Sequence, residues 1–355
     1  MLKHSIFFTL AVIVSYLLFW PTPINPIAWQ APTAPPMSSD NRLSSVEIIA
    51  LPDYGPEDLT LASNGRLYSS SASGAIYQIT GIETRKIADT GGRPLGIEWS
   101  EAHQTLLVAD ALLGLLSVTV DGEVKLLSNN VNGSPIRYAD DVDVTSEGIV
   151  YFSDASTKFT AIEHGSYEAS LLDIMEHGAN GRLLKYDFNT GETSVALESL
   201  HFANGVTVSF DERSVLVVET SKYRVLRYWI NGPNAGQTEV FIDNLPGFPD
   251  NINRNTDGNY WIGLVSPRNS LLDGLSEHPF WRQVIQRLPS WMRPKAERFG
   301  QVIAVNEAGQ LVDHWADQNA RYGFITGALI DGDWMYLSSL HEDSLARVKT
   351  SDQGE

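Results

Sequence analysis

The sequence predicts an all-β fold, a six-bladed β-propeller, preceded by a membrane-anchor helix and interrupted by a helical insertion. Two observations lead to this prediction: a turn-and-strand unit recurs six times along the chain, and one short strand is left over before the first unit. The chain has 355 residues, 43% of them hydrophobic, and no cysteine. A domain of this size can bury a sufficient core without disulfides.

Each unit begins with a turn rich in Gly, Asn or Asp and continues into a run of aromatic or β-branched residues. Units of roughly 40 to 60 residues, each able to supply four strands, favour a propeller, since about 24 short strands are too many for a two-sheet sandwich. The spare strand, Val46–Ile49, is predicted to close the ring in the blade that holds the C-terminal strands. The units begin at Ser63, Ala102, Ser146, Asp211, Thr256 and Asp331.

Residues 1–21 are predicted to form an uncleaved signal anchor. The run Ser5–Trp20 carries no charge and rises about 24 Å as a helix, slightly less than the hydrocarbon core, and Trp29 can extend it at the interface. Lys3 is expected on the cytoplasmic side and the domain on the periplasmic, extracellular or lumenal side. A cleaved signal peptide is the alternative, although the cleavage motif is poor.

The Pro-rich residues 22–43 are expected to form an extended stalk that lifts the propeller, residues 44–350, off the bilayer. Two insertions interrupt the strands. Residues 157–179 contain a helical run, Glu168–Met175, and residues 267–298 place apolar side chains from Phe280 to Leu288 on one helical face. The second insertion is expected to form a cap over the channel mouth, acting as a lid or as a second membrane contact.

Composition and motifs exclude several functions. The net charge of −18 repels phosphate backbones, so no nucleic-acid partner is expected. The chain lacks a Gly-x-Ser-x-Gly elbow, a His-Glu-x-x-His pair, a Walker A loop and a dinucleotide-binding loop. Without cysteine there is no thiolate metal site and no cysteine nucleophile.

Acidic and amide residues stand at the same phase of successive units. Glu57, Asp140 and Asp250 each precede a unit by six residues, and Asn204 does so by seven. Initiation of a turn explains any one such residue, but four in phase indicate a shared level on the propeller axis. Oxygen ligands from separate blades suit Ca²⁺. The expected calcium ligands are therefore Glu57, Asp140, Asn204 and Asp250, with Asn251 beside the last.

Five runs carry a family resemblance: Tyr151–Phe159, Gly181–Asp187, Phe202–Val206, Val218–Trp229 and Phe241–Ile252. They resemble the strictosidine synthase-like family, including its adipocyte plasma-membrane-associated branch, which is N-terminally anchored and associated with arylesterase activity. The likeness covers roughly Gly55–Val348. More distantly, the chain is similar to paraoxonases and to the senescence-marker/gluconolactonase family. All of these relatives are six-bladed propellers, and the resemblance implies that fold here.

In the calcium hydrolases of this group, Glu, Asn and Asp residues on central loops hold the metal. The resemblance places these roles on Glu57, Asn204 and Asp250, with Asn251 adjacent. Asp140 stands where relatives carry Asn, and its charge is expected to strengthen cation binding.

Two positions depart from the families. Thr326 occupies the position of the catalytic Glu of strictosidine synthases, in the segment 324–328, so the condensation reaction lacks its residue. Leu95, in the segment 93–97, occupies the position of the essential His of paraoxonases.

The leading hypothesis is a calcium-dependent hydrolase of a small-molecule ester or lactone, with Asp250 or Asp140 as general base on a water. A non-catalytic propeller, stabilised by calcium and binding a partner on one face, is the alternative. A condensing enzyme ranks last because of Thr326.

Overall fold

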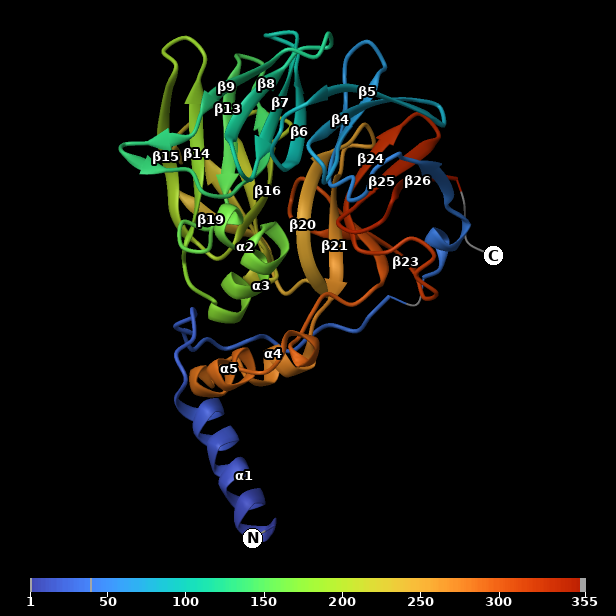
Figure 1. Cartoon of the computed structure of the whole chain (residues 1–355). Helices are drawn as coiled ribbons and strands as arrows, with labels where there is room; N and C mark the ends of the chain where they lie inside the picture. The colour runs from blue at the N-terminus through green and yellow to red at the C-terminus, as the bar shows by residue number, and fades with distance from the viewer. Residues whose placement is uncertain (1, 39, 352–355) are drawn as a thin grey trace.

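The computed structural model describes residues 2–38 and 40–351. In that part of the chain, six antiparallel four-stranded sheets form one body, and helix α1 (Leu2–Phe19) projects away from it (Figure 1). In five of the sheets the strands are consecutive in sequence, so each blade is an up-and-down meander. The predicted six-bladed, mostly β fold is confirmed.

The first three blades hold the following strands: β2 (Leu59–Leu61), β3 (Leu67–Ser70), β4 (Ala75–Thr80) and β5 (Glu83–Asp89); β6 (Pro94–Ser100), β7 (Thr105–Asp110), β8 (Gly114–Val118) and β9 (Val124–Ser128); β12 (Ala139–Val144), β13 (Ile149–Asp154), β14 (Gly181–Asp187) and β15 (Glu192–Leu200). A small hairpin joins blades two and three: β10 (Asn130–Val131) and β11 (Ser134–Pro135).

The last three blades hold the following strands: β16 (Ala203–Val208), β17 (Ser214–Glu219), β18 (Arg224–Trp229) and β19 (Thr238–Ile242); β20 (Gly247–Arg254), β21 (Tyr260–Pro267), β22 (Gly300–Val305) and β23 (Leu311–Asp317); β24 (Ile325–Asp331), β25 (Trp334–Ser339), β26 (Ser344–Lys349) and β1 (Glu47–Ala50). Single turns of 3-10 helix occur at η1 (Arg42–Ser45) and η2 (Thr220–Lys222).

Blade six closes the ring with the first strand of the domain. Strand β1 pairs antiparallel with β26, and Ile49 lies opposite Leu345. This confirms the predicted closure by the spare strand. Apolar side chains fill the space between neighbouring blades, for example Leu59, Leu329 and Ile49 between blades six and one. Full burial of one such side chain contributes about 1.5–3 kcal/mol.

Both insertions are helical. The first holds α2 (Ala161–His164) and α3 (Ser166–Glu176), and the second, residues 267–298, holds α4 (Ser270–Gly274), α5 (Pro279–Gln286) and η3 (Ser290–Met292). The helices predicted at Glu168–Met175 and from Phe280 onward are therefore present.

The face of α5 that packs on the protein differs from the sequence expectation. The polar side chains of Arg282 and Gln286 are buried, whereas the aromatic rings of Phe280 and Trp281 are exposed. The reason is that the Arg282 guanidinium donates to main-chain carbonyls, including that of Met175 at 3.0 Å.

The Pro-rich segment is extended, as expected, but it packs along the body instead of standing free as a stalk. Ile24 is fully buried, and the Ile27 amide donates to the Glu176 carbonyl at 2.9 Å. The Trp29 ring stacks on His177 with 4.0 Å between ring centroids. The backbone amides of an extended segment have no hydrogen-bond partner within the segment. Here a carbonyl at the end of α3 accepts one of them.

Helix α1 presents apolar side chains to its surroundings on all sides, among them Phe7, Phe8 and Phe19. Among residues 2–38 and 40–351, no helix is both long and apolar enough to cross a membrane. Met1 of the expected anchor lies outside the described residues. The anchor over residues 1–21 therefore stays a prediction.

Because β1 closes the ring, substitutions at two adjacent positions of this strand should have unequal effects on stability. Ile49→Ala should lower the free energy of unfolding by about 3 kcal/mol, because it empties a fully buried site between two blades. Ile48→Ala, at a position 47% exposed on the same strand, should change it by less than about 0.5 kcal/mol. Urea denaturation measures both, and equal effects would show that β1 is not packed as described.

Candidate functional site

The innermost strands of the six blades form a ring around the axis. Strands β2, β6, β12, β16, β20 and β24 each contact the next, and β24 contacts β2. Asp140 is the second residue of β12, and Asn204 is the second of β16. Asp250 and Asn251 are the fourth and fifth residues of β20, and Glu57 lies two residues before β2. The equal phase in the sequence thus becomes an equal level on the axis.

A β-bulge recurs at this level. In the five inner strands from β6 to β24 the pairing register shifts within the first few residues, for example between Ala139 and Val142. A bulge releases residues from the ladder and re-aims their side chains. Gly205, beside Asn204, allows the next strand to approach: an added Cβ there would lie 2.4 Å from the Asp250 carbonyl oxygen.

Four of the five expected ligands line one cavity: Glu57, Asp140, Asn204 and Asp250. All four are almost completely buried. The cavity holds about 770 Å³ of space that no atom fills, counting the part open to solvent.

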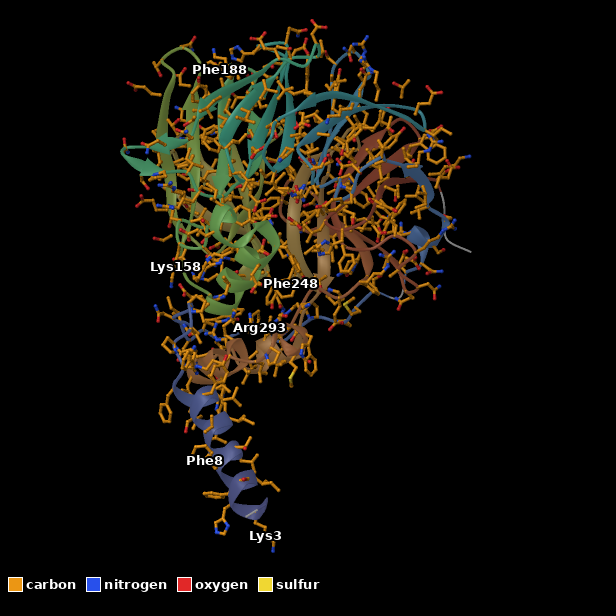
Figure 2. The ribbon with its side chains drawn as sticks, viewed as in Figure 1. Lys3, Phe8, Lys158, Phe188, Phe248 and Arg293 are labelled. Carbon is orange, nitrogen blue, oxygen red and sulfur yellow. The ribbon has the colours of Figure 1, made fainter. Side chains whose placement is uncertain are left out.

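The remaining wall is largely apolar and comes from both the propeller and the insertions. Leu95, Phe202 and Phe248 line it from the blades, and α3 and the segment 267–298 close it from outside. Figure 2 marks Phe248 at the end of the propeller next to the insertion that carries Arg293. The expected cap over the channel is therefore present.

The carboxyl groups in this cavity resist ionisation. Burial, and then the charges of Asp250 and Asp140, raise the pKa of Glu57 well above its ordinary value. Burial and the charge of Asp250 likewise raise the pKa of Asp140. Burial raises the pKa of Asp250 to about 7, although a hydrogen bond from Asn204 acts in the opposite direction. Without a cation, these like charges oppose one another in a medium of low polarity.

The fifth expected ligand, Asn251, has a different place. It is fully buried, does not line the cavity, and donates from Nδ2 to the Glu57 carbonyl oxygen at 2.9 Å and to Glu57 Oε2 at 3.4 Å. Asn251 thus orients Glu57. Its own Oδ1, like Oδ1 of Asn204, is buried without a hydrogen-bond partner.

These donors fit a hard cation by their chemistry. Three carboxylates and amide oxygens are the ligands that Ca²⁺ prefers, and buried unpartnered oxygens are costly unless something binds them. Within residues 2–38 and 40–351, however, no three Asp, Glu, His or Cys side chains are arranged to hold a metal ion as they stand. The shared cavity and the donor types support the predicted site, and calcium coordination stays a prediction.

Thr326 and Leu95, the two positions that depart from the families, lie in different surroundings. Thr326 does not line the cavity: its hydroxyl donates to the Glu57 carbonyl oxygen at 2.6 Å and lies 2.9 Å from Ser338 Oγ. It therefore positions the segment before β2 that carries Glu57. Leu95 does line the cavity, where it adds apolar surface and no proton-transfer group.

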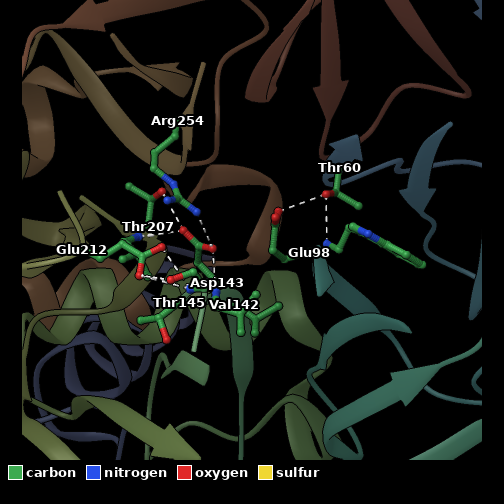
Figure 3. A network of polar contacts seen from close by, with 12 residues as sticks. Thr60, Glu98, Val142, Asp143, Thr145, Thr207, Glu212 and Arg254 are labelled. Atoms are coloured by element: carbon green, nitrogen blue, oxygen red, sulfur yellow. Dashed lines mark hydrogen bonds and ion pairs between the residues drawn. The ribbon is translucent and has the colours of Figure 1, made fainter. Parts of the chain in front are cut away.

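Sequence reasoning missed a second polar space along the inner strands, lined by Asp58, Glu98, Asp143 and Arg254 among others. Arg254 pairs with Asp143 at 3.2 Å, and the Thr60 hydroxyl donates to Glu98 at 3.0 Å (Figure 3). Burial raises the pKa of Asp58 to about 7. The signal was the doubled acid in Glu57-Asp58 and in the run that begins at Asp140, because bulges turn consecutive residues inward.

Two family models match the chain: strictosidine synthase over residues 140–233, and strictosidine synthase-like, N-terminal, over residues 36–79. The adipocyte plasma membrane-associated protein of Salmo salar is 36% identical over 84% of this chain and 76% of its own length. Strictosidine synthase-like protein 6 of Arabidopsis thaliana is 31% identical over 92% of this chain and 87% of its own.

Solved structures share the fold at low identity. A gluconolactonase from Xanthomonas campestris has a TM-score of 0.62 at 14% identity, over 92% of this chain and 98% of its own. The calcium-binding protein regucalcin from Agrobacterium tumefaciens has a TM-score of 0.58 at 12% identity, over 86% and 92%. These similarities establish the propeller and not the reaction.

Because the carboxyl groups are crowded, we predict that the stability of the protein depends on pH when a chelator keeps metal ions away. The folded protein holds the Asp250 proton more tightly than the unfolded chain, whose carboxyl has the ordinary pKa of 3.8. Stability should therefore fall as the pH rises from about 4 to about 7. Asp250→Asn removes this loss, so at pH 8 its free energy of unfolding should exceed that of the parent by roughly 1 to 3 kcal/mol in urea denaturation.

Asp154→Asn is the matched control, because Asp154 is equally buried and burial likewise raises its pKa, but its carboxylate pairs with Arg182 at 2.8 Å. Removing that charge should lower stability by about 3 kcal/mol. If Asp250→Asn destabilised the protein as much as Asp154→Asn, the idea of unrelieved repulsion in the cavity would be wrong.

Proposed function

The chain belongs to the strictosidine synthase-like family, and on that premise we propose that it is a calcium-dependent hydrolase of an ester or lactone, acting in the axial cavity. The observation that carries the proposal is the meeting of Glu57, Asp140, Asn204 and Asp250 around one largely apolar space. Among structures of the same fold are a gluconolactonase and a calcium-binding protein, which agrees with this proposal.

Glu57, Asp140, Asn204 and Asp250 are the residues that would hold the ion. Calcium, when bound, supplies Lewis-acid polarisation of the substrate carbonyl and neutralises the carboxylates. Asn251 and Thr326 act through Glu57, since both hydrogen-bond its carbonyl oxygen. They are positioning residues.

The general base is Asp250 or Asp140. Each has its carboxylate in the cavity and can accept a proton from a water that attacks the ester or lactone carbonyl. Asn204 fixes the Asp250 carboxylate by a hydrogen bond. The apolar side chains of Phe202 and Phe248 would bind the aryl or alkyl part of the substrate and exclude water from it.

A non-catalytic propeller stabilised by calcium is the competing proposal. It is favoured by Leu95 and Thr326, which stand where related enzymes carry a His and a Glu. The buried Thr326 hydroxyl is committed to Glu57 and Ser338, so a condensing activity at that position has no support.

We also propose that α1 anchors the protein in a membrane with the propeller on the exported side. Relatives are named as plasma membrane-associated, and α1 exposes its apolar side chains away from the body. Lys3 lies at the far end of α1 and would stay cytoplasmic (Figure 2).

The test is hydrolysis of a panel of aryl esters and lactones with calcium or with chelator. The parent protein should be active only with calcium, and calcium should raise its melting temperature, because it binds only the folded form. Asp250→Asn should lower kcat/KM by at least about 100-fold, because it removes both a ligand and a base.

The matched control is Asp243→Asn, since Asp243 lies outside the cavity residues and its carboxylate accepts only its neighbour's amide. This variant should keep full activity. A rise in melting temperature with calcium but no hydrolysis of any substrate would favour the non-catalytic propeller. No response to calcium in either measurement would refute both proposals.

A further inference from the structure

The outer surface of the second insertion exposes large apolar side chains. Trp291 is 76% exposed, and the other four are about half exposed. We call these five residues the cap surface: Leu271, Phe280, Trp281, Trp291 and Met292. Exposed tryptophan and phenylalanine in one short segment are uncommon on a water-facing surface.

Helix α5 is amphipathic in the inverse sense of an ordinary surface helix. A surface helix usually turns its apolar face inward. In α5 the buried side chains are Arg282 and Gln286, and the exposed ones are Phe280 and Trp281. Arg282 is buried at a cost that only several hydrogen bonds offset, and the carbonyls of Met175 and Ser276 accept two of them. The aromatic face is therefore displayed outward while a charge is buried.

The cap surface lies at the base of α1. The Arg287 guanidinium donates to the carbonyls of Leu17 and Trp20, two of the acceptors that the C-terminal end of α1 leaves free. In Figure 1, α4 and α5 run across the end of α1 instead of continuing its direction. A membrane that α1 enters would therefore have α5 lying along its surface.

The charge of this segment differs in sign from that of the rest of the chain. Residues 267–298 carry six Arg and Lys against three Asp and Glu, whereas the whole chain has a net charge of −18. Arg282 and Arg287 are buried, and the exposed charges balance, since Lys295 and Arg298 are exposed and so are Glu277 and Glu297. The exposed aromatic side chains, and not the net charge, are therefore what suits this surface to the interfacial layer of a bilayer.

We propose that the cap surface inserts into the interfacial layer of the bilayer that α1 enters, so that the propeller rests on the membrane by two contacts. The proposal extends the membrane attachment proposed above and does not depend on the hydrolytic activity. Because Asn269, Leu272 and Lys295 of the same insertion line the axial cavity, one wall of the cavity would face the lipid surface.

The experiment uses the full chain, whose lack of cysteine allows single labels. Ser290→Cys in the cap, Ala11→Cys in α1 and Asn189→Cys at a far loop would each carry an environment-sensitive fluorophore. Each protein is reconstituted in phosphatidylcholine vesicles, with or without phosphatidylglycerol. Nitroxide-labelled lipid then reports contact with lipid, and iodide reports contact with water.

The label at position 290 should lose most of its fluorescence to the nitroxide lipid, with or without phosphatidylglycerol, and should be shielded from iodide. The label at position 189, beside Phe188 at the opposite end of the body, should show the reverse (Figure 2). Trp281→Ser combined with Trp291→Ser should restore iodide quenching at position 290 and leave position 11 unchanged.

Three outcomes would overturn the proposal. Quenching by lipid at position 11 together with iodide quenching at position 290 would mean that α1 anchors the chain and the cap stays in water. Shielding of position 290 from both quenchers would mean that the cap surface contacts a second copy of the chain. Iodide quenching at both positions would refute the cap contact and the anchor together. Lipid quenching at 290 but not at 11 would uphold the cap contact and refute only the anchor.

Discussion

The pairing of β1 with β26 holds the beginning and the end of the propeller in one sheet, and the geometry of the axis depends on it. Only a closed ring brings the innermost strands of all six blades into mutual contact. Residues as distant in sequence as Glu57 and Thr326 then hydrogen-bond at 2.6 Å. Ring closure leaves each blade with only short, protected edges and fixes the distance between facing strands, so it also fixes the size of the axial cavity.

That closure has an electrostatic consequence. Bulges on five inner strands turn polar side chains toward the axis, where they are removed from water. The pKa of each of the three carboxyl groups in the cavity is raised, so folding without a cation works against their ionisation. Elsewhere the fold satisfies buried carboxylates directly, as Arg182 does for Asp154. Carboxyl groups of the second polar space, among them Asp58 and Glu98, also have raised pKa values, so the perturbed acids cluster along the axis. Such clustering is the pattern expected of a functional site.

The second insertion and the N-terminal segment are joined to each other and to α3 by direct contacts. The amides of Asn25 and Ile27 donate to Glu176 at the C-terminal end of α3, and Trp29 stacks on His177, which follows it. Arg282 joins α5 to this segment and to α3 through main-chain carbonyls, and Arg287 joins α5 to α1. These contacts therefore link α1, through α5, to α3, whose residues line the cavity.

The sequence was enough to predict the six blades, the closing strand, the two helical insertions and four of the cavity residues. It could do so because turns, strand periodicity and the phase of Glu57, Asp140, Asn204 and Asp250 are local features of the chain. Tertiary structure alone decided that Asn251 orients Glu57, that α5 buries Arg282 instead of its aromatic face, and that the Pro-rich segment packs on the body. Each depends on partners more than 100 residues away, such as Glu57 for Asn251 and Glu176 for Ile27, and no periodicity within a segment records which distant backbone groups lack a partner.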